Sequence, residues 1–442
     1  MDIQPDDAYA QHQMLEWKKR YHPMIAQPVQ MRLELEQTRF KVVPAGRRSG
    51  KTERAKRRVI KEALKLPNGR FFCAAPTRDQ AKRIYWSDIK MLIPPIMRGE
   101  HSESELCARL KNGAEIYIIG MDKPQRFEGQ PWDGGIVDEF ADMKESAWQE
   151  NIRPALDTMG REAWCWLIGV PDGLNHYYEI AEYAMTSNDP EWGYYTWKSA
   201  EILPAKTILA AKRELSPRAY RQEYEAAFEN ATGRVYEDYG RHNHTDRVCD
   251  PKMPIHWTHD FNFLPMSSVI IQLDPLTSTH AYCVDEIILN SADAKIAVTE
   301  FVERYRHHQA KKLYLYGDAS GRAGEKHNIA SDYIEMERVL RAEGWSVERR
   351  VPLGNPAIKN GQNSLRSRIM NANGDVRFFV NPAKCKVTNK GLNIVSLKEG
   401  SAFIEEEIYE QHVTTALRYF THMLWPIQGE PSRIITVPHM GR

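Results

Sequence analysis

The sequence predicts an α/β protein in two parts, a mainly parallel sheet followed by a mixed α/β domain. Apolar, strand-like runs alternate with helical segments up to about residue 173, which is typical of a parallel sheet. Charged helical sequence then occupies 200–238, and a second set of strand-like runs begins at Ile255. We therefore expect domains at 1–200 and 251–442, joined by a helical lid or linker at 201–250.

The composition is that of an ordinary soluble globular protein. Of the 442 residues, 42% are hydrophobic and 27% are charged, and the net charge is +1. Contacts with nucleic acid must therefore come from local basic clusters, such as 54–61 and 304–312, each of which also fits a solvated face. The polar N-terminus is unlike a signal peptide, and no apolar run reaches the roughly 18 residues of a membrane span. The six cysteines form no close pair, so neither a zinc site nor a disulfide framework is indicated.

The strands of the first domain follow in order. A short β-branched run at 39–43 leads into a glycine-rich turn, and a charged helix with apolar residues near helical spacing follows at 51–66. Four further strands are expected, at 70–77, 114–122, 134–140 and 164–173.

The second domain begins after a polar stretch that resembles a linker. Three successive strands are expected at 255–263, 266–274 and 279–289, and a fourth, 311–320, follows a helix. A meander followed by a helix and a strand predicts a mixed sheet.

The turn at 45–52 resembles a phosphate-binding P-loop. Gly50, Lys51 and Thr52 match the end of the G-x-x-x-x-G-K-[ST] pattern, in which backbone N–H groups cradle phosphates, the lysine reaches the outer phosphates and the hydroxyl meets Mg²⁺. Alanine stands where the first glycine belongs, and we expect the next residue to supply the bend. A chance match is the alternative. The predicted nucleotide-binding residues are Ala45, Gly46, Arg47, Arg48, Ser49, Gly50, Lys51 and Thr52.

Two acids at the end of the strand "GGIV" strengthen the nucleotide hypothesis. P-loop ATPases hold Mg²⁺ with an aspartate at such a position, here Asp138. Glu139 follows directly and is placed to orient or deprotonate the attacking water. The alternative is that both acids only line the N-terminus of a helix.

Several acids fall on the strands of the second domain. Asp260 lies in its first strand, Asp318 ends a later strand, and Asp285 and Glu286 lie between them. Carboxylates from several strands suit two divalent ions that flank a scissile phosphate, and Mg²⁺ prefers such oxygen ligands. Solvated strand ends remain the alternative.

In this order, the motifs resemble those of the large terminase subunit of tailed bacteriophages, over nearly the whole chain. "GRRSGKT" resembles its Walker A motif, and "IVDEF" resembles Walker B with the catalytic glutamate. "RQEYEAAFENATGRVYED" resembles the segment between motor and nuclease. "THDFN", "VDE", "YGDASG" and "NGDVRFFVNP" resemble the RNase H-like nuclease.

The resemblance implies a P-loop ATPase motor with ATP and Mg²⁺, joined to an RNase H-like endonuclease in which Mn²⁺ can substitute for Mg²⁺. It implies Mg²⁺ at Thr52 and Asp138, catalysis by Glu139, and an arginine, Arg126, that reaches a neighbouring subunit's ATP or else forms a structural ion pair. The implied nuclease residues are Asp260, Glu286 and Asp318.

The resemblance also implies partners and a location. These are double-stranded DNA, a portal protein, a small terminase subunit and further copies in a ring, a pentamer on the procapsid, with a monomer in isolation left open. The location is the host cytoplasm, transiently at the portal, without a membrane. Arg322 and Lys326 are candidate phosphate contacts, or else solvated loop charges.

One position departs from the family pattern. Near the C-terminus the family has His-x-x-Asp-Ala-Leu-x-Tyr, whereas this chain has "HVTTALRY", with Thr415 in place of a metal-binding aspartate. His412 or an upstream acid could substitute, or the second ion could bind only with DNA. The departure also keeps open a helicase-like ATPase, or a scaffold, with a degenerate second domain. The upstream acids are Glu405, Glu406, Glu407 and Glu410.

Overall fold

The chain folds into two compact units. The computed structural model describes residues 12, 14, 15, 17, 27–127, 129–229, 233–261, 266–290, 294–319, 329–352, 354–398, 401 and 403–427. The first unit comprises Met1–Ile208 with Arg221–Asn230, and the second comprises Leu209–Tyr220 with Ala231–Arg442. Two helices, α8 (Ala205–Glu214) and α9 (Pro217–Glu225), therefore each begin in one unit and end in the other. In the part of the chain that the structure describes, no helix is long and apolar enough to cross a membrane.

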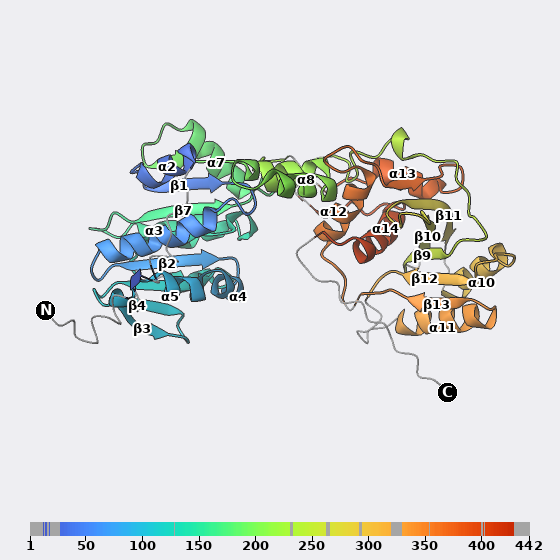
Figure 1. Ribbon diagram of the computed structural model, residues 1–442, viewed down its shortest axis with the longest axis horizontal. Coiled ribbons are helices and arrows are strands. Elements are labelled where there is room, and N and C mark those ends of the chain that lie inside the picture. The colour runs from blue at the N-terminus through green and yellow to red at the C-terminus, as the bar shows by residue number, and fades with distance from the viewer. Residues whose placement is uncertain are drawn as a thin grey trace. The chain divides into compact units, whose positions relative to one another are not determined.

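An eight-stranded sheet organises the first unit, in the order β3-β4-β5-β2-β6-β7-β1-β8 (Figure 1). Within this order, the six neighbouring strands β5, β2, β6, β7, β1 and β8 run parallel to one another. At one edge, β4 pairs antiparallel with both β3 and β5. A mainly parallel sheet was predicted and is confirmed. The strands are β1 (Phe40–Pro44), β2 (Arg70–Ala75), β3 (Arg98–Ser102), β4 (Cys107–Leu110), β5 (Glu115–Gly120), β6 (Gly134–Val137), β7 (Trp164–Gly169) and β8 (Trp192–Tyr194).

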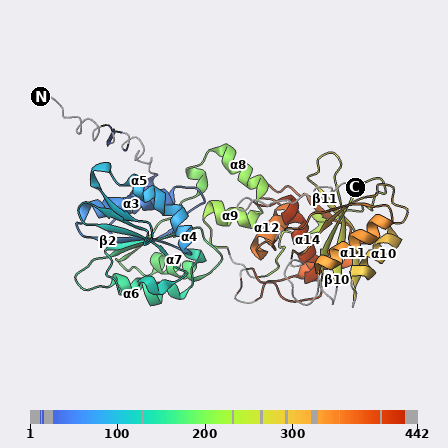
Figure 2. The same cartoon turned by 90° about the horizontal axis from the view of Figure 1, so that it is seen from below.

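Helices cover both faces of this sheet (Figure 2). One apolar core lies under α3, α4 and α5, and a second lies under α6 and α7. Burial of strands on both faces explains their nearly continuous apolar sequences. The helices are α2 (Pro28–Leu35), α3 (Lys51–Lys65), α4 (Arg78–Ala81), α5 (Ser87–Leu92), α6 (Arg153–Leu156) and α7 (His176–Thr186), with a π-helical stretch, η1 (Lys82–Trp86), between α4 and α5.

The second unit contains a six-stranded mixed sheet, in the order β13-β12-β9-β10-β11-β14. β10 runs antiparallel to β9 and β11, whereas β12 pairs parallel with β9, β13 with β12, and β14 with β11. This is the expected RNase H-like arrangement. The strands are β9 (Ile255–Asp260), β10 (Met266–Leu273), β11 (Ala281–Leu289), β12 (Lys312–Tyr316), β13 (Ser346–Arg349) and β14 (Phe378–Val380).

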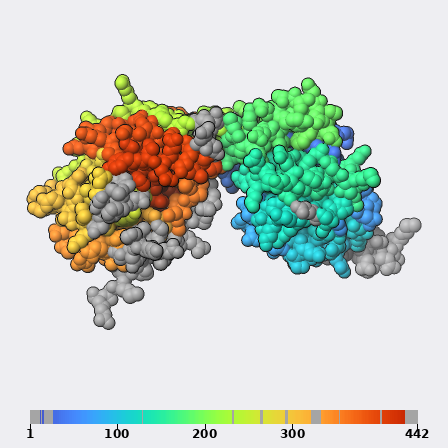
Figure 3. Space-filling model, turned by 180° about the vertical axis from the view of Figure 1, so that it is seen from behind, coloured from blue at the N-terminus to red at the C-terminus, as the bar shows by residue number. Residues whose placement is uncertain are grey.

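Two helical layers enclose the mixed sheet. α10 and α11 pack over one apolar core, and α12, α13 and α14 pack over the other. Seen from behind, the last of these segments form a broad part of the surface of the second unit, coloured red in Figure 3. The helices are α10 (Ala294–Arg304), α11 (Ile329–Ala342), α12 (Ile358–Ile369), α13 (Lys386–Ile394) and α14 (Gln411–Leu424).

Candidate functional site

The P-loop joins the end of β1 to the start of α3. Gly50, the N-cap of α3, has a φ of 88°, and Arg48 is also left-handed with a φ of 55°. These two residues turn the chain so that the first N–H groups of α3, which have no partner within the helix, face the loop. A helix N-terminus of this kind is suited to bind phosphate.

Gly46 has a different role from the one that the sequence predicted. The turn of the loop comes from Arg48 and Gly50, and Gly46 is not among the residues with positive φ. Instead, a Cβ at Gly46 would lie 2.4 Å from Ser199 Oγ, 2.5 Å from Ser199 N and 2.7 Å from Tyr224 O. Glycine is therefore needed at this position because two other segments approach the loop closely.

The two loop arginines differ in their surroundings. The backbone N–H of Arg47 donates to Glu223 O at 2.7 Å, and its guanidinium lies 3.2 Å from the Glu223 carboxylate. Ser199 Oγ donates to Arg47 O at 2.8 Å, so the loop is held from both sides. Arg48 is exposed. Contacts with α9 therefore fix the position of Arg47, although its side chain, like that of Arg48, is exposed.

Asp138 lies at the centre of the candidate nucleotide site, directly after β6. Its Oδ2 accepts hydrogen bonds from Thr52 Oγ1 at 3.0 Å and from Tyr85 Oη at 2.8 Å, and its Oδ1 accepts from the N–H of Glu139 at 2.9 Å. Lys51 and Asp138 are 6% and 1% exposed. Burial raises the pKa of Asp138, and the Lys51 charge and the three hydrogen bonds oppose this. A carboxylate and a hydroxyl thus meet where Mg²⁺ would need them, so the residues fit this ion.

Glu139 has a strained backbone next to Asp138. Its φ of 50° is left-handed, a conformation that non-glycine residues adopt rarely and that is common at functional sites. Burial, and next the negative charge of Asp138, raise the pKa of Glu139 to about 7. A carboxylate with a pKa near neutrality is suited to general base catalysis.

Arg126 lies on the short helix η3 (Pro124–Phe127) and is exposed. Its neighbour Phe127 is fully buried against Phe72 and Trp132, which anchors the turn. Among the described residues, the structure shows no bond between Arg126 and the Asp138–Glu139 pair. The predicted role of Arg126 in a neighbouring subunit stays a prediction.

The two aspartates predicted for a nuclease site lie at the carboxyl ends of two neighbouring strands of the second sheet. β9 and β12 are parallel neighbours, with Thr258 opposite Tyr316, and Asp260 and Asp318 each follow two residues later. The two carboxylates also act together on Tyr419, whose pKa is raised by burial first and then by their negative charges. The sheet thus brings the two predicted aspartates to one place.

His412 joins Asp260 from another element. It lies in the first turn of α14, and its Nδ1 is 2.9 Å from Asp260 Oδ2. The helix is fixed over the strand by Thr258, whose hydroxyl donates to Ala416 O at 2.6 Å. The alternative in which His412 takes part in the nuclease site therefore has geometric support.

Glu286 does not join this pair. Its Oε1 accepts from the N–H of Val387 at 2.8 Å, and its Oε2 accepts from the N–H and hydroxyl of Thr388 at 2.8 and 2.9 Å. The carboxylate therefore caps the N-terminus of α13, where the helix dipole favours a negative charge. The sequence predicted that Glu286 is a metal ligand. In the structure, both of its carboxylate oxygens instead accept hydrogen bonds from the first turn of α13.

A buried ion pair lies beside Thr415, the residue that stands in place of the family's aspartate. Thr415 Oγ1 accepts from Gln411 Nε2 at 2.8 Å and from Arg418 Nη2 at 2.7 Å. Arg418 Nη1 lies 2.9 Å from Glu405 Oε1, and the two side chains are 9% and 2% exposed. Glu405 is thus occupied by Arg418 and is not directed to Asp260. The other three candidate acids pair elsewhere: Glu406 with Ser396, Glu407 with Lys398 and Glu410 with Lys390.

The residues predicted for the nuclease site do not by themselves form a complete metal site among the described residues. Within the described ranges, no three His, Cys, Asp or Glu side chains are grouped closely enough to hold a metal ion. Asp260 and Asp318 are of the right chemical kind for Mg²⁺ or Mn²⁺. Arg322 and Lys326, the candidate phosphate contacts, lie outside the described residues.

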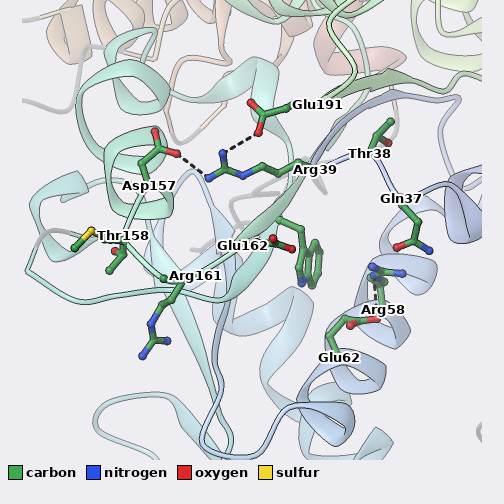
Figure 4. A pocket seen from close by; sticks show the side chains of 13 residues that line it. Gln37, Thr38, Arg39, Arg58, Glu62, Asp157, Thr158, Arg161, Glu162 and Glu191 are labelled. Atoms are coloured by element: carbon green, nitrogen blue, oxygen red, sulfur yellow. Dashed lines mark hydrogen bonds and ion pairs between the residues drawn. The ribbon is translucent and has the colours of Figure 1, made fainter.

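A polar pocket of 620 Å³ lies at the amino-terminal ends of β1 and β7 (Figure 4). It is lined by Thr38 and Arg39, which precede β1, and by Trp164, which opens β7, whereas the P-loop follows the end of β1. Arg39 donates to Asp157 and Glu191 there. The pocket is therefore separate from the candidate nucleotide site, and its Arg39 already pairs with two of its acids.

Sequence reasoning missed several residues around both sites. Tyr85 contacts Asp138 from 53 positions away, and no local pattern distinguishes it from a core tyrosine. Tyr333 approaches Asp318, whose backbone carbonyl lies 3.5 Å from the tyrosine hydroxyl. The Arg418 and Glu405 pair was missed as well, although "TALRY" and the acidic run before it were visible.

Known proteins resemble this chain in sequence over its first half. Residues 43–238 match the family "Terminase large subunit, T4likevirus-type, N-terminal". A terminase large subunit of Thermus phage G20c is 24% identical over 242 residues, 47% of this chain and 50% of that protein. That of Escherichia phage T5 is 28% identical over 234 residues, 52% of each. The chain thus matches about half the length of these relatives.

Solved structures resemble both units in fold. The large terminase of the thermophilic bacteriophage D6E has a TM-score of 0.58 at 16% identity, covering 94% of this chain and 98% of that one. The same protein in complex with ADP gives a TM-score of 0.57 at 17% identity, covering 93% and 98%. The segment with the P-loop and the Asp138–Glu139 pair is thus similar in sequence to large terminase subunits, and the chain shares its fold with the D6E large terminase.

Proposed function

We propose that this chain is the motor and nuclease subunit of a viral DNA-packaging machine. ATP hydrolysis in the first unit would drive duplex DNA into a procapsid, and the second unit would cut the concatemer before and after. The observation that carries the proposal is the buried meeting of Thr52 and Asp138, 3.0 Å apart, beside Lys51 and Glu139. The D6E relative, which was solved with ADP and with ATP-γ-S, supports nucleotide binding by the same fold.

The residues of the first unit divide the work of hydrolysis. The N–H groups at the start of α3 and the Lys51 ammonium bind the phosphates, and Thr52 and Asp138 would hold Mg²⁺, which supplies charge neutralisation at the phosphates. Glu139 orients the attacking water and accepts its proton, which its raised pKa favours. Arg126, exposed on η3, would complete the site of a neighbouring copy in a ring.

In the second unit, Asp260 and Asp318 would hold the divalent ion, Mg²⁺ or Mn²⁺, that promotes phosphodiester hydrolysis. His412 fixes the orientation of the Asp260 carboxylate through its 2.9 Å contact. Grip on DNA should come from neutralisation of phosphate charge, so it should weaken steeply with salt. A portal protein and a small terminase subunit are the proposed protein partners.

Two assays test the proposal. Wild-type protein should hydrolyse ATP with Mg²⁺, and Glu139→Ala should nearly abolish turnover, because electrostatic and base catalysis carry most of this reaction. Wild-type protein should nick plasmid DNA with Mn²⁺, and Asp260→Ala should not. ATP hydrolysis by Glu139→Ala at the wild-type rate would refute the assignment of the first unit.

A motor whose second unit does not cut is the alternative. The Thr415–Arg418–Glu405 group favours it, because a positive charge stands near the position of a metal-binding aspartate. ATP-dependent strand unwinding together with no plasmid cleavage in Mn²⁺ or Mg²⁺ would support this alternative, whereas cleavage that Asp260→Ala abolishes would exclude it.

A further inference from the structure

Tyr85 connects the π-helical stretch η1 to the Asp138 carboxylate of the first unit, the group proposed to bind the cation. Its hydroxyl donates to Asp138 Oδ2 at 2.8 Å, and the whole side chain is 0% exposed. We propose that Tyr85 is a positioning residue, which holds the Asp138 carboxylate in the orientation that binds the divalent cation. This proposal rests on the ATPase function proposed above and assigns a role to a residue outside the P-loop and outside the Asp138–Glu139 segment.

The hydrogen bonds of Asp138 show why a second donor matters. Thr52 Oγ1 also donates to Oδ2, at 3.0 Å, and the N–H of Glu139 donates to Oδ1 at 2.9 Å. Thr52 is the residue expected to turn its hydroxyl oxygen toward a cation, so its bond to Asp138 is subject to change. The Tyr85 hydroxyl has no such second task, and it can restrain Oδ2 whether or not the site is loaded.

The position of Tyr85 is itself fixed. It lies in the π-helical stretch η1, and the wide turns of such stretches recur at functional sites. Lys56 Nζ lies 5.9 Å from the centre of the Tyr85 ring and bridges Glu53 at 2.7 Å and Asp88 at 2.6 Å. The ion pair between Lys56 and Asp88 thereby joins α3, which begins at the P-loop, to α5 beside the Tyr85 ring. Figure 2 shows these helices on one side of the sheet.

The energetic role follows from burial. Asp138 is 1% exposed, so water cannot replace a lost donor easily. A hydrogen bond to a charged group contributes more than one between neutral groups, and removing one partner leaves the other undersatisfied. Without the hydroxyl, the ionised carboxylate should be less stable and less well oriented, and cation binding should weaken.

The substitution Tyr85→Phe tests this, because it removes the hydroxyl and keeps the ring. The Mg²⁺ concentration that gives half-maximal ATP hydrolysis should rise about tenfold or more. The KM for ATP at saturating Mg²⁺ should change by less than about twofold, because the phosphate contacts of the P-loop remain. The ADP-dependent part of Mn²⁺ binding, measured by electron paramagnetic resonance, should weaken by the same factor without any turnover.

Tyr177→Phe is the matched control. Tyr177 is also fully buried in the first unit, but its hydroxyl donates to Leu167 O at 3.2 Å and not to a carboxylate. This variant should lose a buried hydroxyl and keep the wild-type dependence on Mg²⁺.

Three outcomes decide the matter. Wild-type Mg²⁺ and Mn²⁺ dependence in Tyr85→Phe would overturn the proposal. If Tyr85→Phe and Tyr177→Phe showed the same weakening of metal binding, the same rise in KM and the same fall in melting temperature, Tyr85 would have only a structural role. That result would also overturn the proposal. If the wild-type protein bound Mn²⁺ with ADP but hydrolysed no ATP, the ATPase proposal would fail, and the Mn²⁺ comparison would still decide the role of Tyr85.

Discussion

The imidazole of His412 lies against the carboxylate of Asp260, with Nδ1 2.9 Å from Oδ2, although 152 positions separate the two residues. Asp260 ends β9 and is 6% exposed, so few water molecules can reach its carboxylate. The contact with His412 therefore contributes to the orientation of this carboxylate. A partner that orients a metal-binding carboxylate has a measurable effect on metal affinity.

His412→Ala should therefore impair DNA cleavage through its metal dependence. The Mn²⁺ concentration that half-activates plasmid cleavage should rise by about tenfold, since loss of such outer partners costs about 10–100-fold. Plasmid nicking across a Mn²⁺ titration measures this. His242→Ala, at an exposed histidine of the same unit, is the control and should match the wild type. An unchanged Mn²⁺ requirement in His412→Ala would remove His412 from the site.

Glu286→Gln should affect the stability of α13 and not metal binding. The substitution removes a charge that accepts three hydrogen bonds at the start of this helix, which should cost about 1–2 kcal/mol. Hydrogen exchange at the amides of Val387 and Thr388 should become faster, whereas the Mn²⁺ requirement for cleavage should stay constant. Glu303→Gln, at an exposed acid of α10, is the control. A raised Mn²⁺ requirement with unchanged exchange would return Glu286 to the role that the sequence predicted.

The buried pair of Glu405 and Arg418 should contribute strongly to the stability of the second unit. Glu405→Leu leaves the Arg418 charge buried without its partner, which typically costs about 3–5 kcal/mol. Adding Arg418→Met should recover part of this loss, because a matched apolar pair avoids the unpaired charge. Thermal unfolding measures both variants, and Glu407→Gln, whose side chain is 87% exposed, should unfold like the wild type. A double variant less stable than Glu405→Leu would contradict this account.

The geometry of the candidate nucleotide site was predictable where its residues are contiguous. Lys51, Thr52, Asp138 and Glu139 fall in two short segments, each at the end of a strand, and parallel strands bring such ends to one edge. Gly46 was predicted for the wrong reason, because its need for glycine comes from Ser199 and Tyr224, which are close in space and distant in the chain. A local pattern reports φ preferences and does not report which segment packs against the loop.

The second unit was less predictable, because the local sequence around each acidic residue does not indicate which residues its side chain contacts. Asp260 and Glu286 both lie on strands of one sheet, yet one meets His412 and the other caps a helix. The edge strands β13 and β14 have four and three residues, too short for a clear alternation, and their pairing depends on the strands beside them. Tertiary packing therefore determines what the sequence pattern leaves open.

The pH dependence of ATP hydrolysis should follow the ionisation of Glu139. Its pKa is raised to about 7, first by burial and then by the charge of Asp138, and the protonated form cannot accept a proton from water. kcat/KM, which reports groups of the free enzyme, should therefore be low below neutral pH and rise as pH increases through about 7. A pH–rate profile with saturating Mg²⁺ measures this limb.

A neighbouring carboxylate provides the control for that profile. The negative charge of Asp142 also raises the pKa of Glu139, so Asp142→Asn should move the acid limb toward lower pH. Asp142 is exposed and its influence is screened by solvent and salt, so the shift should be less than about half a pH unit and smaller still at high ionic strength. Glu139→Gln should abolish the limb together with turnover. An acid limb near the pKa of an ordinary exposed glutamate, or a shift of the opposite sign in Asp142→Asn, would show that another group accepts the proton.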